Sequence, residues 1–527
     1  MSPLHVESAP PATGTGAAPV PARAGWRDVI LGFVPAHRRT RAARWIGHLP
    51  LLLILALQAV LTLRLSNTAY RDEALYIWTG HRIFQYWFDG AQLYDNPSSY
   101  FSGSPFVYPP LAALIDIPFG LGGVRAFSLL CMGAATVAIW AMTTRMFGRR
   151  AAVLAAAAFV VSGPVQHLGN FATFDALALV LLAGGTALGL RGLGTHRIWW
   201  AAVGGTLLAV AVTAKYASLM FVPAAFALLL LAPVGRPVTG RSRLAALAAS
   251  AGTFGVVLVT WALTIGRNDV TGFMSSTVSR TGPMIVDPDS FAGVVGRALG
   301  FAGPWYLLMV VGGIMLFVRR RNRVLAAVLF GAAILPVLYQ GYLGEAVSLD
   351  KHIAFGLVFG VPLIGVIAGL ATRAGMTMLL GLVLVVLTIY GAATSSRIFS
   401  AWSNTKALTD VMAYKFAAAP YIRTLGEPFE PVRYAFVEST EYWQWATTDP
   451  IEALYFQTDD GQPLRGIAAA KAGLQADYWQ VVYLNGSTGA SQELEPLLPG
   501  FGYQLTDTVN LQNANGPDVY RIWQRFN

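Results

Sequence analysis

The sequence predicts a polytopic α-helical membrane protein with a C-terminal α/β domain outside the bilayer. Hydrophobic residues make up 55% of the 527-residue chain and charged residues only 12%, a composition too apolar for a soluble protein of this length. Apolar runs of about 17 to 22 residues, each long enough to cross a bilayer, recur up to residue 394. Roughly the last 130 residues alternate instead between strand-like, helical and Gly/Pro/Asn-rich segments.

The apolar runs predict about eleven membrane spans. They lie near residues 48–65, 125–144, 151–165, 172–190, 198–214, 216–233, 244–265, 299–318, 324–342, 353–370 and 376–394. Basic clusters occur at residues 38–44, 145–150, 191–197, 236–243, 319–323 and 373. If every span is real, all these clusters fall on one side, and basic loops face the cytoplasm. The N-terminus is therefore predicted to be cytoplasmic and the C-terminus extracytoplasmic.

The net charge of +10 belongs to the membrane part of the chain. From Arg397 onward there are 9 Lys and Arg against 14 Asp and Glu, which leaves 28 against 13 before it. A basic surplus in a membrane protein marks cytoplasmic loops and contacts with anionic lipid headgroups. We therefore expect membrane lipids, and no nucleic acid, among its partners.

The chain is predicted to have three parts. Residues 1–45 are rich in Pro, Ala, Gly and Arg without a signal-peptide pattern, so we expect a disordered cytoplasmic tail before an uncleaved first span. Residues 46–395 form the transmembrane domain, with long external loops at 66–124 and 266–298. Residues 396–527 form the soluble extracytoplasmic domain, with strand-like runs at 433–438, 479–484 and 519–523. The single cysteine, Cys131, falls inside a span, so packing alone must hold the external domain together.

The predicted internal loops are all short, and the sequence contains no Gly-x-x-x-x-Gly-Lys-Ser/Thr phosphate-binding loop. A cytoplasmic site for ATP or a nucleotide sugar would need a sizeable internal loop or domain. We therefore expect the function to reside on the external face.

The first external loop carries an acidic pair, Asp72 and Glu73, in the first turn of a predicted helix capped by Asn67 or Thr68. Apolar side chains at helical spacing indicate a helix lying in the membrane interface. Two interpretations of the pair are open. Carboxylates in a first turn complement the helix dipole without any chemistry. A carboxylate at the lipid–water boundary is also placed to accept a proton from a substrate hydroxyl.

The same loop is rich in Tyr, Trp and Phe, as both sugar-binding sites and membrane-interface belts are. It closes in Tyr-Pro-Pro-Leu at 108–111, a rigid segment that a regular helix would not carry in its interior. This segment is either a plain turn before the second span or part of a substrate site to which Tyr108 contributes.

Five short motifs occur in order along the membrane region. They are Arg-Asp-Glu-Ala-Leu-Tyr at 71–76, Tyr-Pro-Pro-Leu at 108–111, Ala-Thr-Phe-Asp-Ala at 172–176, Ala-Lys-Tyr at 214–216 and Ser-Leu-Asp-Lys-His at 348–352. Together they resemble bacterial GT-C glycosyltransferases, in particular the branch with protein O-mannosyltransferases and the lipid A aminoarabinose transferase. The resemblance implies a GT-C fold, and a soluble C-terminal domain is common in that branch.

The resemblance also implies an activity, the inverting transfer of a hexosyl or pentosyl group from a polyprenyl-phosphate carrier to an acceptor hydroxyl. The acceptor would be a protein, a glycolipid or a cell-wall glycan at the outer face of a bacterial inner membrane. It further implies Asp72 as general base, with Glu73 as its neighbour in substrate binding or as the alternative base. The chemistry agrees, because a lipid phosphate is already a good leaving group and needs only a base and cations.

Cationic partners for that phosphate are expected on the outer side. The candidates are Lys215, Lys351, His352, Arg82 and Arg280. For Lys215 and Lys351 the alternative is that each side chain snorkels from a span end. Asp175, at the start of a span, either binds substrate or caps its helix.

A metal site is not predicted, although a divalent cation is left open as a cofactor. Asp287-Pro-Asp289 in the second long external loop resembles an acidic metal-binding pair, but Pro between two Asp residues is common in plain turns. His167 has no ligand-spaced His, Cys or carboxylate near it in sequence, so we interpret it as a packing residue.

Two other functional classes compete with the enzyme. A transporter or lipid flippase would be expected to show paired internal repeats and charges buried within spans, and the sequence shows neither. An envelope-assembly scaffold would use its soluble domain alone and leave Asp72 and Glu73 as a helix cap. Which sugar, which acceptor and which oligomeric state apply does not follow from the sequence.

Overall fold

The computed structural model describes residues 41–526 without 94–95, 100, 196, 236, 268–271, 275–288, 319–321, 371–373, 420–421, 439–450, 452–453, 459–460 and 487, and without the side chains of 41–46 and 99. The chain divides into two compact units, residues 1–50 and 51–527. The first unit contributes only the start of helix α2 (Arg41–Thr62) to the described residues. All elements discussed below belong to the second unit.

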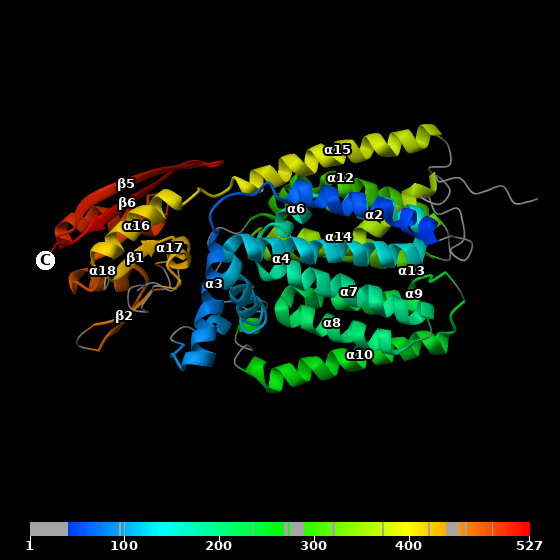
Figure 1. Cartoon of the computed structure of the whole chain (residues 1–527), viewed down its shortest axis with the longest axis horizontal. Helices are drawn as coiled ribbons and strands as arrows, with labels where there is room; N and C mark the ends of the chain where they lie inside the picture. Colours follow the sequence, from blue (N-terminus) through cyan, green and yellow to red (C-terminus); the bar gives the residue numbers. More distant parts are fainter. Residues whose placement is uncertain are drawn as a thin grey trace, which may run out of the picture. The chain divides into compact units, whose positions relative to one another are not determined.

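Apolar helices dominate residues 51–399 (Figure 1). They are α4 (Tyr108–Phe147), α5 (Arg149–Val160), α6 (Gly163–Gly169), α7 (Phe174–Thr195), α8 (Trp199–Ala214), α9 (Val222–Leu231), α10 (Gly240–Leu263), α12 (Phe291–Val318), α13 (Arg323–Leu343), α14 (Leu349–Val366) and α15 (Ala374–Phe399). Within the described residues, seven helices are long and apolar enough to cross a membrane, and eight if α5 and α6 form one bent span. Three shorter apolar helices cover Gly47–Thr62, Trp199–Ala214 and Tyr216–Leu231. Each predicted span coincides with one of these helices, and the count of eleven stays a prediction.

The helices pack around one continuous apolar core. Helices α4, α7, α8 and α10 run side by side, and α14 packs between α5, α12 and α13 (Figure 1). From Ile353 to Val366 every residue of α14 is buried. A helix that is apolar all round must be enclosed by others, which places α14 at the centre of the bundle.

The order of the helices brings the candidate site residues to one end of the bundle. The chain runs up one helix and down the next, so the segment before α4, the start of α7, the break between α8 and α9 and the turn before α14 share that end. The C-terminal ends of α4 and α7, which carry Arg145 and Arg191, lie at the opposite end of the bundle. This agrees with the sidedness expected from the basic clusters, and which end faces outward stays a prediction.

Helix α4 begins earlier than the predicted second span. Pro109 and Pro110 lie in its first turn, where a missing N–H removes no hydrogen bond, so Tyr-Pro-Pro starts a helix. The last part of the loop expected at 66–124 is therefore helical. The helix breaks at Gly120, whose φ of 61° is in the left-handed region that favours glycine.

The predicted helix in the first external loop is present as α3 (Arg71–Phe84) and continues into η2 (Gln85–Asp89). Its N-cap is Tyr70, so the expected cap at Asn67 or Thr68 is wrong. The cap differs because the Glu73 carboxylate accepts the Tyr70 backbone N–H at 2.9 Å, the side-chain half of a capping box. Helix α3 crosses close to α4 at Gly80, where a Cβ would lie 2.0 Å from the Pro109 carbonyl oxygen.

The C-terminal domain is α/β, as predicted. Its elements are α16 (Lys406–Ala418), β1 (Thr424–Glu427), α17 (Glu430–Ala435), β2 (Tyr455–Gln457), β3 (Pro463–Arg465), α18 (Gly466–Gln475), β4 (Val481–Asn485), α19 (Gly489–Leu494), β5 (Gln504–Asn513) and β6 (Gly516–Gln524). The main sheet has the order β1-β4-β6-β5, with β1 parallel to β4 and the other pairs antiparallel. One apolar cluster joins the sheet to α18 and α19, and another joins it to α16.

Two of the three predicted strands in this domain are confirmed. The runs at 479–484 and 519–523 correspond to β4 and β6. The strand expected at 433–438 is wrong, because α17 occupies Glu430–Ala435. Pro431 in the first turn favours a helix start, and helix α17 packs against α3 rather than entering the sheet.

Helix α17 attaches the C-terminal domain directly to α3. Arg71 donates to Glu430 at 2.8 Å, and the Tyr434 hydroxyl donates to Asp116 of α4 at 2.8 Å. Arg433 is 1% exposed, and its guanidinium carbon lies 4.1 Å from the Trp78 ring centroid and 4.5 Å from that of Phe429. The helix that carries Asp72 is thus held by both domains.

We expect Arg433→Ala to loosen this attachment. The substitution removes a desolvated cation between two rings, worth about 2 kcal/mol or more. Limited proteolysis of the full chain should cut the C-terminal domain faster, and its thermal unfolding should begin at a lower temperature. Arg423→Ala is the matched control, because Arg423 lies 4.3 Å from the ring of Tyr478 within the same domain. Equal effects of the two substitutions would contradict a role for Arg433 in attachment.

Candidate functional site

Asp72 lies at one end of the helix bundle, opposite a lysine from α14. The Lys351 Nζ is 2.6 Å from the Asp72 Oδ2, and the Asp72 side chain keeps 34% of its surface exposed while that of Lys351 keeps 8%. Lys351 Nζ also lies 4.9 Å from the Phe171 ring centroid, a cation–π distance. A partly exposed carboxylate is therefore fixed in place by a nearly buried cation.

A second ion pair joins the start of α7 to the break between α8 and η4 (Tyr216–Phe221). Lys215 pairs with Asp175, both almost fully buried, and the Thr173 hydroxyl donates to Asp175 at 2.8 Å. Lys215 has extended backbone angles and interrupts the helix, which turns its side chain into the protein. The backbone N–H of Tyr216 is held by the Ser102 carbonyl at 2.9 Å, so the first external loop fixes this break.

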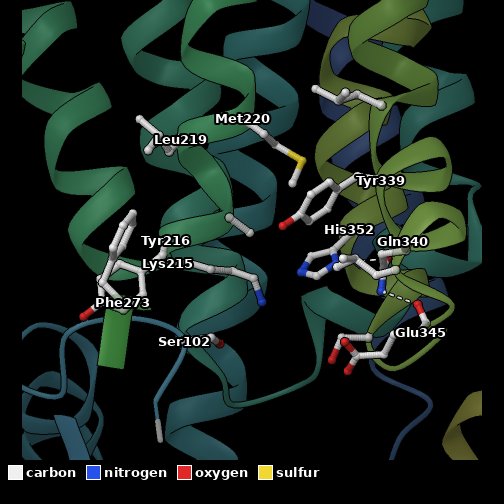
Figure 2. Close-up of a pocket in the computed structure, with 14 residues that line it drawn as sticks. Ser102, Lys215, Tyr216, Leu219, Met220, Phe273, Tyr339, Gln340, Glu345 and His352 are labelled. Carbon is white, nitrogen blue, oxygen red and sulfur yellow. Dashed lines mark hydrogen bonds between the residues drawn. The ribbon is translucent and has the colours of Figure 1, made fainter. Parts of the chain in front are cut away.

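Two histidines form hydrogen bonds near the start of α14, one of them from α6. His167 Nδ1 lies 2.8 Å from Asp350 Oδ2, and His352 Nδ1 lies 3.1 Å from Gln340 Oε1. Because Gln340 donates its amide nitrogen to the carbonyls of residues 345 and 347, its oxygen faces His352 and requires the proton on Nδ1. The other nitrogen of His352 is left to face the cavity (Figure 2).

Two cavities meet at these charged groups. One, of about 640 Å³, holds the Asp72–Lys351 pair together with Tyr70, Arg71, His167 and Asp350. The other, of about 430 Å³, is lined mainly by apolar and aromatic residues, with Lys215 and His352 at its edge (Figure 2). Its apolar walls come from Leu219, Met220, Leu335, Tyr339 and Leu343. Lys215, Ser102 and Ser348 line both cavities.

We refer to these as the Asp72 cavity and the apolar cavity. Their sizes are within the range of ligand sites in proteins. Burial and the negative charge of Asp72 raise the pKa of the Tyr70 phenol, so Tyr70 is protonated at neutral pH and is not a proton acceptor.

Glu73 has a different environment from its neighbour. Its side chain is fully buried and forms a two-oxygen pair with Arg125, at 2.9 Å from Nε and 2.7 Å from Nη2. It also accepts the Ala172 backbone N–H at 2.8 Å. Arg125 in turn donates to the Asn67 carbonyl at 2.7 Å. Glu73 therefore connects α3, α4 and the start of the Ala-Thr-Phe-Asp-Ala segment through hydrogen bonds. Because its side chain is fully buried, a substrate cannot contact it.

The structure brings five of the predicted residues together and places Arg82 and Tyr108 elsewhere. Asp72, Asp175, Lys215, Lys351 and His352 line the two cavities or pair with residues that do. Arg82 is bound to Gln85 and to the Val437 carbonyl, away from both cavities. Tyr108 is fully buried and packs behind Tyr76 and Phe174, which line the Asp72 cavity. Arg280 and Asp287 lie outside the described residues, and Asp289 pairs with Arg297 at 2.8 Å.

Several site residues were not expected from the sequence. His167 was interpreted as a packing residue, yet it lines the Asp72 cavity and pairs with Asp350. Asp350 lies in the Ser-Leu-Asp-Lys-His motif at 348–352, so it could have been predicted as a site residue from the sequence. Arg125 and Glu430 carried no such signal, because their partners Glu73 and Arg71 lie 52 and 359 positions away in sequence. Gln340 lies 12 positions from His352 but stands outside the five motifs. Among the described residues, no three His, Cys, Asp or Glu side chains group closely enough to hold a metal ion.

The chain combines a bundle of apolar helices, with a partly exposed aspartate and two buried lysines at one end, and a C-terminal α/β domain. Residues 109–262 match the family described as dolichyl-phosphate-mannose-protein mannosyltransferase. A search of curated proteins by sequence finds no match.

Solved structures show the same fold along nearly the whole chain. ArnT from Cupriavidus metallidurans, bound to undecaprenyl phosphate, is 14% identical with a TM-score of 0.58, and the match covers 91% of this chain and 98% of that one. Oligosaccharyltransferase AglB from Archaeoglobus fulgidus, in complex with an inhibitory peptide and a dolichol-phosphate, is 11% identical with a TM-score of 0.58, covering 91% and 74%. Arabinofuranosyltransferase AftD from Mycobacteria is 14% identical with a TM-score of 0.52, covering 91% and 40%.

This chain therefore has the GT-C fold, with a multi-pass membrane part and a C-terminal α/β domain. The resemblance drawn from its five motifs is confirmed.

Proposed function

We propose that the protein is a glycosyltransferase that moves a sugar from a polyprenyl-phosphate carrier to an acceptor hydroxyl, at the outer face of a bacterial inner membrane. One observation carries the proposal: the apolar cavity and the Asp72 cavity, which holds a partly exposed carboxylate, meet at Lys215. A lipid-linked donor needs apolar walls for its chain and a cation for its phosphate. An acceptor hydroxyl needs a base.

The apolar cavity suits the carrier. Leu219, Met220 and Leu335 offer surface to an isoprenoid chain, and Lys215 and His352 stand where a phosphate at the end of that chain would reach. The described lining of the apolar cavity contains a single carboxylate, that of Glu345. Phosphate binding in such a site favours cations that are already in place. ArnT and AglB have been solved with undecaprenyl phosphate and dolichol-phosphate, which supports this class of ligand.

Asp72 supplies the base. In the proposed step the acceptor oxygen attacks the anomeric carbon, the bond from that carbon to the phosphate oxygen breaks, and the acceptor proton passes to Asp72. The carrier leaves as a polyprenyl phosphate, and attack from the face opposite the leaving group inverts the anomeric centre. Lys351 holds the Asp72 carboxylate at 2.6 Å, and Lys215 and Lys351 are the cations for the departing phosphate. Glu73 takes no part in the proton transfer and positions the helix.

Transfer by the purified full chain tests this proposal. The protein is reconstituted in lipid nanodiscs with synthetic polyprenyl-phosphate hexoses and pentoses, and with peptide, glycolipid and oligosaccharide acceptors. We expect a glycosylated acceptor and free polyprenyl phosphate in equal amounts. Sugar transfer from none of the donors to any acceptor would reject the enzyme and favour a scaffold or a transporter.

Lys215→Gln should weaken donor binding. A charge-assisted hydrogen bond to phosphate is worth roughly 1.5 to 3 kcal/mol, so the KM for the donor should rise about 10- to 100-fold. Because the substitution leaves Asp175 buried without its cation, the double variant Asp175→Asn with Lys215→Gln removes both charges and keeps the site neutral. Lys406→Gln, which breaks an exposed pair in the soluble domain, is the control. An unchanged donor KM in the folded double variant would exclude Lys215 from phosphate binding.

A further inference from the structure

A third cavity lies beside the Asp72 cavity, between the membrane helices and the soluble domain. It has a volume of about 640 Å³ and is lined by residues 64–67 after α2, by the end of α15 and the segment after it, and by the tip of the β5–β6 hairpin. Trp402 lines this cavity and the Asp72 cavity alike. We call it the hairpin groove.

The hairpin groove is lined by apolar side chains and by polar side chains that are almost all uncharged. Amides come from Asn67, Asn404, Gln512 and Asn513, and hydroxyls come from Ser66, Ser396 and Ser400. Its described lining contains no carboxylate and one cation, Arg64. Amides and hydroxyls both donate and accept hydrogen bonds, as the hydroxyl groups of a sugar do.

Arg64 is already engaged within the protein. Its guanidinium donates to the carbonyls of Leu61 and Ala392 and to the side chains of Gln166, Ser395 and Ser396, at 2.5 to 3.3 Å. These contacts use all five of its N–H donors. The donors of Arg64 are thus bound within the protein, and the other polar groups of the groove are neutral amides and hydroxyls, which favours a neutral ligand.

Trp402 links the groove to the proposed base. Its indole N–H donates to the Thr68 carbonyl at 3.2 Å, and its ring lies 4.7 Å from that of Tyr70. Tyr70 and Asp72 line the other side. A chain-like ligand in the groove that passes Trp402 would therefore present one end to Asp72. Aromatic rings also pack well against the C–H faces of sugars.

We propose that the hairpin groove binds a neutral oligosaccharide, and that this glycan is the acceptor whose terminal hydroxyl reaches Asp72. The assignment of the glycan as acceptor rests on the glycosyltransferase function proposed above. The groove itself is a binding site that does not depend on catalysis. It gives the soluble domain a definite role, because Gln512 and Asn513 come from its hairpin.

Two substitutions test the groove without disturbing the fold. Gln512 is exposed, and within the described residues its amide reaches only the Asn513 carbonyl at 3.5 Å, so Gln512→Ala removes little structure. The Asn404 Oδ1 accepts the Lys406 N–H at 3.0 Å. Asn404→Asp keeps that contact and replaces the amide donor by a carboxylate. Gln504→Ala, an exposed change at the other end of β5, is the matched control.

The experiment measures binding of neutral tetrasaccharides of mannose, glucose and arabinose to the full chain in nanodiscs by saturation-transfer NMR and calorimetry. We expect at least one of them to bind wild type and Asp72→Asn equally, and the double variant Gln512→Ala with Asn404→Asp to bind it at least tenfold more weakly. The Gln504→Ala control should match wild type. In the transfer assay, the double variant should raise the KM for the glycan acceptor and leave the donor KM unchanged.

Three outcomes would overturn the assignment. They are no binding of any tetrasaccharide, binding that the double variant does not weaken, and binding of a serine-rich peptide at the groove in place of a sugar. Failure of the proposed function is distinct, because wild type would then transfer no sugar while the groove variants still altered oligosaccharide binding.

Discussion

Replacing Asp72 by Asn should lower the rate of sugar transfer by about 100- to 10,000-fold, the range that a positioned general base contributes. Asn keeps the size of the side chain and an oxygen for Lys351, but it cannot accept the acceptor proton. The loss should fall on kcat, since Asp72 does not line the apolar cavity proposed for the donor. Single-turnover assays with radiolabelled donor measure it.

The control for this prediction is Asp89→Asn. Asp89 is exposed in η2, at the end of the segment that α3 begins. Its removal changes the charge of the protein by the same amount, at a residue that is not among the described lining of the Asp72 cavity or the apolar cavity. Transfer by Asp72→Asn at the rate of wild type and of Asp89→Asn would exclude Asp72 as the base.

Replacing Glu73 by Gln should mainly reduce stability. The Glu73–Arg125 pair is almost fully buried, and removing one partner of such a pair costs about 3 to 5 kcal/mol because the other charge is left uncompensated. We expect a lower midpoint of thermal unfolding in detergent, and a lower yield of folded protein. Arg125→Gln should have a similar effect.

Comparison with Asp72→Asn separates the roles of the two acids. Asp72 is partly exposed, and Asp175 and Asp350 also act on Lys351, so its loss should cost less stability. The opposite pattern, an inactive Glu73→Gln variant that unfolds like wild type, would make Glu73 the base instead.

Much of the fold followed from periodicity and composition. Each predicted span coincides with a helix because apolar runs of this length have no other stable state in a bilayer. The interruption of the helix at Lys215 could be predicted, because this charged residue separates two apolar runs in the sequence. The helix at 71–84 could be predicted from the spacing of its apolar residues, whereas its N-cap could not. The cap depends on Glu73, whose position is set by Arg125 more than 50 residues away.

The candidate site was predictable where its residues stand in motifs, and not where it depends on distant partners. Asp72, Lys215 and Lys351 were expected together on one side. His167 was not, since its contact with Asp350 joins residues separated by 183 positions. The prediction of a strand at 433–438 was wrong for a related reason, because residues in this segment contact distant parts of the chain. Arg433 and Tyr434 fit a strand by propensity, but they are held by Trp78 and Asp116 in the membrane part.

The ion pair between Asp72 and Lys351 also bears on how charge moves during turnover. A sugar-linked phosphate carries about one negative charge and the released phosphate about two near neutral pH. In the proposed reaction Asp72 loses a negative charge as it takes the proton, while the phosphate gains one. Total charge at the bundle end is thus conserved, and Lys351, 2.6 Å from Asp72 at the start, loses its hydrogen-bonded anion as a new one forms nearby. A lysine that exchanges one partner for the other would stabilise the products without any ion entering from water.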